Sequence, residues 1–130
     1  MKTYFALVHK EPGSAFGVTF PDIPGCYSAA DRLEDVVPNA CEALDLWFED
    51  AEEVEPSDAE AIGKAHAADL AKGAFLVAIP RVSREGKPVR VNISLDRGIL
   101  DAIDAAAAMR KLTRSAFIAE AAKNEIELAH

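Results

Sequence analysis

The segment V-R-V-N-I-S-L-D, residues 89–96, decides how the C-terminal part of this chain folds. Polar and apolar residues alternate strictly from residue 90 to residue 95, which is the pattern of a strand with one buried face. The polar face consists of Arg90, Asn92 and Ser94, and the apolar face consists of Val91, Ile93 and Leu95. The sequence therefore predicts a half-buried strand over 89–95.

Two helical patterns follow this strand. Ile99, Ile103 and Ala106 or Ala107 lie on one stripe of the first helix. Thr113 is the expected N-cap of the second helix. The second helix should direct one apolar face inward, formed by Phe117, Ile118, Ala121, Ala122 and Ile126. One strand and two helices of this size bury too little surface to fold alone, so we expect two copies to associate through residues 89–126.

The expected dimer is a two-stranded antiparallel ribbon over four interlocked helices. Its outward face would present Arg90, Asn92 and Ser94 twice. A two-stranded ribbon fits the major groove of DNA, where Arg and Asn can each make two hydrogen bonds to a base edge. The amide groups that open the second helix, at Thr113, Arg114 and Ser115, suit a phosphate. The alternative is a polar strand face without a nucleic-acid partner.

This combination resembles the ribbon-helix-helix family of DNA-binding repressors. The resemblance rests on the strand Val89–Leu95, the turn residue Asp96 and the Thr113-Arg114-Ser115 start of the second helix. That family usually has Gly where the first helix ends, and this chain has Lys111. A Lys in a left-handed conformation costs about 1 kcal/mol, so we expect this turn to be built differently.

Charge is distributed unevenly along the 130 residues, which carry a net charge of −8. Residues 1–80 hold 5 Lys/Arg against 15 Asp/Glu, a net charge of −10, and residues 81–130 hold 9 against 7, a net charge of +2. The acidic part would repel phosphate and attract a basic protein. If nucleic acid is bound, residues 81–130 bind it.

The front part predicts a small α+β domain over 1–80, joined by a linker at 81–88 to the unit at 89–130. Expected strands are Lys2–His9, Ala15–Phe20, Cys26–Ala30 and a buried Ala74–Ile79 that Pro80 closes. A helix should begin near Glu34 or Asp35, because Pro38 is comfortable only in a first turn, and run to Ala51. Ser57 should cap a second helical run that continues to Lys72 and ends at Gly73.

The front part is similar to the HicB antitoxin family over residues 3–56. The segments that carry this resemblance are Tyr4–Val8, Gly17–Cys26, Asp31–Asp35 and Asn39–Leu44, with F-P-D-I-P-G-C at 20–26 the most specific. Arg32, where the family often has Thr or Ser, and Pro38 depart from the family pattern. The resemblance implies a partial RNase-H-like fold that binds a HicA toxin, a small basic ribonuclease that cleaves mRNA, and covers its active site. It further implies repression of the toxin–antitoxin operon through the C-terminal dimer.

Enzymatic and metal-binding functions are weakly supported. The carboxylates at Glu11, Asp22, Asp31 and Asp35 do not lie mid-strand, where two Mg²⁺ ions would need rigid ligands. His9, His66 and His130 lack the spacing of a metal site. Cys26 and Cys41 lie in apolar contexts typical of buried, reduced thiols, and no run is long enough to span a membrane. We therefore expect a non-enzymatic, cytoplasmic protein without cofactor or metal.

The toxin is expected to contact either the acidic helix Glu34–Glu53 or the strand region near Tyr27, and we favour Phe20, Asp22 and Tyr27. The predicted assembly is a homodimer through 89–126 and a tetramer through the front halves. A different class of function stays open: a stand-alone ribbon-helix-helix transcriptional regulator whose N-terminal domain binds a small ligand or only oligomerises. A small basic toxin-like gene beside this one would favour the antitoxin.

Overall fold

A computed structural model describes residues 1–83 and 88–127. The chain forms two compact units, Met1–Ser83 and Arg84–His130. Residues 84–87 of the predicted linker lie outside the described residues. Among the helices that are described, none is both long enough and apolar enough to cross a bilayer.

The first unit is built on a four-stranded antiparallel sheet, which gives it the α+β class expected from the sequence. Its strands are β1 (Lys2–Lys10), β2 (Phe16–Thr19), β3 (Tyr27–Ala30) and β4 (Phe75–Arg81), in the order β3-β2-β1-β4. β1 pairs with β2 as a hairpin, with Val8 opposite Val18, and with β4, with Tyr4 opposite Ile79. β3 and β4 are therefore the two edges of the sheet.

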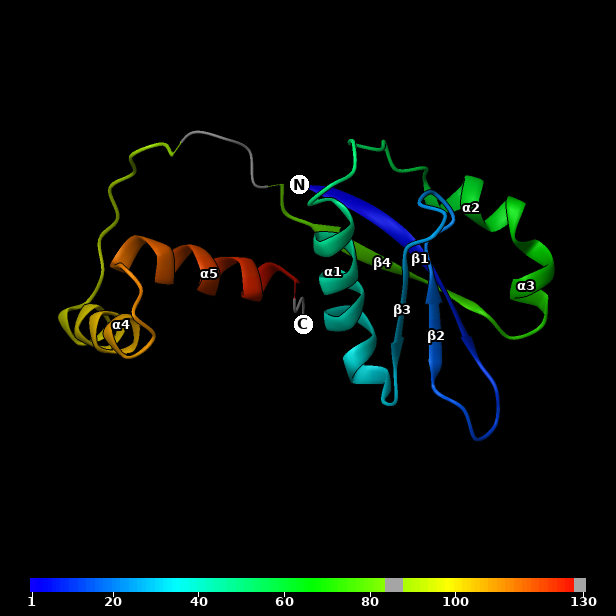
Figure 1. The fold of residues 1–130 in the computed structure, drawn as a ribbon, viewed down its shortest axis with the longest axis horizontal. Coiled ribbons are helices and arrows are strands. Elements are labelled where there is room, and N and C mark those ends of the chain that lie inside the picture. Colours follow the sequence, from blue (N-terminus) through cyan, green and yellow to red (C-terminus); the bar gives the residue numbers. More distant parts are fainter. Residues whose placement is uncertain (84–87, 128–130) are drawn as a thin grey trace. The chain divides into compact units, whose positions relative to one another are not determined.

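Helix α1 (Val36–Trp47) lies across one face of this sheet (Figure 1), preceded by the short 3-10 helix η1 (Leu33–Asp35). Pro38 falls in the first turn of α1, as predicted, because its missing N–H is not needed there. The helix ends at Trp47, earlier than the predicted Ala51. Alternate residues of the strands and one stripe of α1 form the main core, which includes Tyr4, Ala6, Val8, Val18, Val36, Ala40, Leu44 and Ile79.

The segment after α1 differs from the prediction in two ways. The expected single helix is two short helices, α2 (Ala59–Ala65) and α3 (Ala67–Ala71), which meet at His66. Asp58, rather than Ser57, caps α2, because its carboxylate accepts a hydrogen bond from the N–H of Ala61 at 2.8 Å. Gly73, at φ 100°, follows α3 as expected.

Strand β4 does not stop before Pro80, so that part of the prediction is wrong. Pro80 pairs in register with Thr3, and the strand continues to Arg81. β4 is an edge strand, where the missing N–H of proline is tolerated because only one side of the strand must be paired. For the same reason β4 is less buried than predicted, with Ala78 exposed and Phe75, Leu76 and Val77 half-buried.

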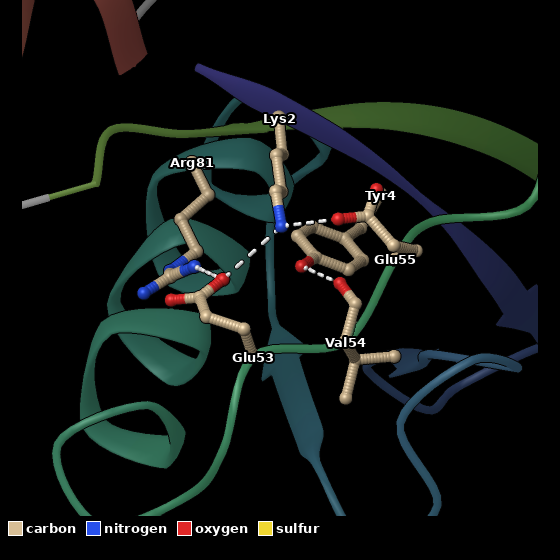
Figure 2. A network of polar contacts seen from close by, with 6 residues as sticks. All are labelled: Lys2, Tyr4, Glu53, Val54, Glu55 and Arg81. Atoms are coloured by element: carbon tan, nitrogen blue, oxygen red, sulfur yellow. Dashed lines mark hydrogen bonds and ion pairs between the residues drawn. The ribbon is translucent and has the colours of Figure 1, made fainter.

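A polar network fastens the loop after α1 to the ends of β1 and β4, as Figure 2 shows. Arg81, only 8% exposed, donates to Glu53 at 2.8 Å, and its guanidinium lies 3.9 Å from the ring centroid of Phe48. Lys2 reaches Glu55 at 2.8 Å and Glu53 at 3.4 Å. The hydroxyl of Tyr4 donates to the carbonyl oxygen of Val54. The guanidinium of Arg81 holds the pKa of Glu53 below its usual value.

The second unit contains α4 (Arg97–Met109) and α5 (Arg114–Glu127). The hydroxyl of Thr113 accepts a hydrogen bond from the N–H of Ala116 at 3.1 Å, which confirms Thr113 as an N-cap. The expectation of an unusual turn at Lys111 is wrong, because Lys111 itself adopts the left-handed conformation at φ 57°. The turn it makes is a Schellman motif, with hydrogen bonds from Leu112 N–H to Ala107 O at 2.8 Å and from Lys111 N–H to Ala108 O at 3.1 Å.

Residues 88–96 form no strand within the single chain. The apolar residues of this segment are uncovered, with Val89 81%, Val91 74% and Ile93 59% exposed. A strand requires a neighbour for its backbone hydrogen bonds, and a lone chain offers none beside this segment. The strand predicted over 89–95 is therefore not formed by the single chain and stays a prediction.

Candidate interaction surfaces

The first candidate surface is the segment expected to read DNA. Arg90, Asn92 and Ser94 are all exposed, and so are the apolar residues between them. Within the described residues, 1–83 and 88–127, neither face is buried, so the alternation of the sequence is not used by the single chain. Both the polar row and the apolar row remain available for contacts with other molecules.

The start of α5 is the second part of this surface. The Thr113 hydroxyl is already used as the helix cap, and Ser115 is exposed in the first turn. The Arg114 guanidinium makes two hydrogen bonds of 2.8 Å to the Asp104 carboxylate on α4. This pair lowers the pKa of Asp104 and raises that of Arg114. Arg114 therefore joins α4 to α5 in the free chain.

The three front-half residues predicted to contact a partner lie in different environments. Phe20 is 3% exposed and packs in the core, so its side chain offers little surface to a partner. Asp22 accepts hydrogen bonds from the backbone N–H of Ser57 at 2.7 Å and from its hydroxyl at 2.8 Å, which ties two loops together. Tyr27 is 70% exposed and is the accessible member of the set.

The segment 20–26 is a compact turn, and its last two residues, Gly25 and Cys26, line a hollow beside Tyr27. Ile23 and Cys26 are buried, and the turn is closed by hydrogen bonds from Ile23 N–H to Phe20 O at 3.0 Å and from Cys26 N–H to Ile23 O at 3.1 Å. Gly25, at φ 96°, allows Trp47 to approach, because a Cβ there would lie 3.1 Å from the Trp47 ring. Burial raises the pKa of the Cys26 thiol, and neither Cys26 nor Cys41 forms a disulfide.

The hollow has a volume of about 340 Å³ and is open to solvent. Its lining residues are Gly25, Cys26, Tyr27, Ala43, Leu46 and Trp47. Sequence reasoning missed Leu46, which is 60% exposed. The signal was present, since Leu46 departs from the inward three- and four-residue spacing of α1 and shares a face with Glu42.

Two of the three histidines, His9 and His66, lie near the carboxylate of Asp69. His66 Nδ1 is 3.2 Å from Asp69 and His9 Nε2 is 3.5 Å from it. Both contacts lower the pKa of Asp69, the contact with His66 having the larger effect. Across residues 1–83 and 88–127, no group of three or more His, Cys, Asp or Glu side chains could hold a metal ion. His130 lies outside the described residues.

Comparison with known proteins places the chain in a family. Residues 4–122 match the model of the HicB-like antitoxins of bacterial toxin–antitoxin systems, a match that spans both units. The chain belongs to this family. It is 31% identical, over 94% of its length and 96% of the relative's, to an uncharacterised 14.9 kDa protein in the rep–hol intergenic region of Haemophilus phage HP1.

Two solved structures resemble the whole chain. The Burkholderia pseudomallei antitoxin HicB is 33% identical, with a TM-score of 0.53, and the match covers 100% of both chains. The antitoxin HicB3 is 28% identical, with a TM-score of 0.50, and the match covers 95% of this chain and 97% of that one. These likenesses extend through the C-terminal unit, beyond the resemblance over residues 3–56.

Proposed function

We propose that this chain is the antitoxin of a pair, that it neutralises a small, basic, mRNA-cleaving toxin of the HicA type by covering its active site, and that it represses its own operon. Membership of the HicB-like antitoxin family supports the first role. In this proposal the front unit is a partial RNase-H-like fold that serves binding rather than catalysis, and the C-terminal unit binds DNA. The linker predicted over 81–88 begins after Arg81, because this residue ends β4.

Charge supports the division of labour between the units. The front part has a net charge of −10 and the C-terminal part has a net charge of +2. Opposite charges on two partners accelerate their association and exclude wrong partners, so an acidic front unit favours a basic protein. The same acidic surface disfavours DNA, which assigns operator binding to residues 89–130.

One observation carries the DNA-binding proposal: residues 89–95 expose an apolar row and a polar row on alternate positions, and neither is used by the single chain. Pairing with the same segment of a second copy supplies the missing backbone hydrogen bonds and covers Val91, Ile93 and Leu95 on the helices of the dimer. The opposite face of the ribbon then presents two sets of Arg90, Asn92 and Ser94 to the major groove. Association of front units would extend the dimer to a tetramer.

Co-expression tests both roles in one experiment. A HicA-type toxin gene is induced with and without this chain, and growth and repression of a promoter fusion are measured. We expect rescue of growth, a co-purifying complex and repression. Asn92→Ala should keep the rescue and lose the repression, because the two roles reside in different units. Failure of the wild-type chain to rescue growth refutes the antitoxin role.

A further inference from the structure

The hollow lies between β3 and the C-terminal half of α1. Apolar side chains stand exposed on both of its sides: Tyr27 on the edge strand and Leu46 on the helix, 70% and 60% exposed. Between them Trp47 is half-buried against Gly25. Single exposed apolar residues are common on proteins, but several gathered around one hollow mark an interaction site.

The segments that form the hollow meet for local reasons. α1 runs alongside β3, with Asn39 Nδ2 donating to the Ala29 carbonyl at 2.9 Å and the Cys26 thiol directed at the Ala43 carbonyl at 3.7 Å. The two alternative partner regions in the sequence, the acidic helix and the strand near Tyr27, therefore adjoin and form one surface. The Ala29 carbonyl on this strand is thus already bonded within the unit.

Acidic residues surround the exposed Leu46. Glu42 lies one turn before it on the same face of the helix, and Glu49 and Asp50 follow the end of the helix, all three exposed. No basic residue lies in the last turn of α1, where the helix dipole adds negative potential. A partner that fills the hollow must therefore bring positive charge as well as an apolar side chain.

We propose that this hollow is where the front unit grips its basic partner, receiving an apolar or aromatic side chain flanked by Lys or Arg. The inference rests on the proposed antitoxin function, in which that partner is the toxin. Tyr27, Leu46 and Trp47 supply the apolar contact, and Glu42, Glu49 and Asp50 supply the complementary charge. Side-chain insertion, not strand addition, provides the affinity, as is typical of a buried anchor at an interface.

Binding of the full-length chain to a catalytically inactive form of the toxin tests this surface, measured by calorimetry at two salt concentrations. Leu46→Lys should weaken binding about 30-fold or more, the size of a hot-spot loss, and Tyr27→Ala should do the same. Leu33→Lys is the matched control, because Leu33 is also 60% exposed and lies at the other end of α1. It should bind within about 3-fold of wild type, since rim and remote positions contribute little.

The outcomes separate this inference from the function on which it rests. If the wild-type chain does not bind the toxin, both the proposed antitoxin function and the inference about the hollow are refuted. If wild type binds and Leu46→Lys and Tyr27→Ala bind as tightly as Leu33→Lys, the hollow is not the contact and the antitoxin role stands. If Leu46→Lys instead lowers the mass of the toxin-free protein, a second copy of this chain occupies the hollow and the inference is overturned.

Discussion

Replacing Lys111 by glycine should stabilise the C-terminal unit. Lys111 holds a φ of 57° in the Schellman turn that ends α4. A side chain with a Cβ in this conformation costs about 1–2 kcal/mol. Glycine removes that cost, but it increases the conformational entropy of the unfolded chain, which lowers the free energy of unfolding by about 0.4–1 kcal/mol. The expected net gain in the free energy of unfolding is about 0.5–1 kcal/mol.

Thermal unfolding followed by circular dichroism measures this gain as a rise of about 2–8 °C in the midpoint, given about 4–8 °C per kcal/mol for a small domain. Protein concentration must be held constant, because association of copies makes the midpoint concentration-dependent. Lys111→Ala is the matched control, since it removes the charge and keeps the Cβ and therefore the strain. If Lys111→Gly is no more stable than Lys111→Ala, the left-handed turn at this position is refuted.

Three further predictions address the polar contacts and the DNA surface. Arg81 holds the pKa of Glu53 below its usual value. The stabilisation that Glu53 provides is therefore present above the ordinary carboxyl pKa and is lost as the pH falls through the lowered pKa of Glu53. Urea titrations should show that the stability advantage of wild type over Glu53→Gln disappears between neutral and strongly acidic pH. Arg114→Ala and Asp104→Ala should lower the thermal midpoint equally and without additivity, because each removes the same ion pair, whereas additive effects would exclude the pairing. Arg90→Ala and Asn92→Ala should each weaken operator binding by about 1–3 kcal/mol in gel-shift titrations and relax sequence preference, while a uniform loss on all DNA would indicate phosphate contacts instead.

Local signals in the sequence predict several elements of both units. The hairpin of β1 and β2, the start of α1 around Pro38 and the N-cap at Thr113 all follow from short-range rules, and the structure confirms them. The family resemblance also follows from short segments, above all residues 20–26, and the family match over residues 4–122 confirms it. The structure adds that Phe20, Ile23 and Cys26 of this motif pack in the core and that Gly25 and Cys26 line the hollow.

Long-range contacts explain what sequence reasoning missed. Ser57 has the residue type of a helix cap, but its hydroxyl donates a hydrogen bond to Asp22, 35 residues away. Asp58 caps the helix instead. Pro80 looks like a strand terminator, but it is tolerated because β4 is an edge strand. The alternation of Phe75, Val77 and Ile79 extends to Arg81, which could have placed this arginine in the unit rather than in the linker.

The pairing of residues 89–95 between two copies is tested most directly by the mass of two neighbouring variants in sedimentation equilibrium. Ile93→Asp and Ser94→Asp add the same charge one residue apart, on opposite faces of the proposed ribbon. The proposal predicts that Ile93→Asp halves the mass of the assembly, while Ser94→Asp keeps the wild-type mass and loses operator binding. Equal masses for the two variants would contradict it.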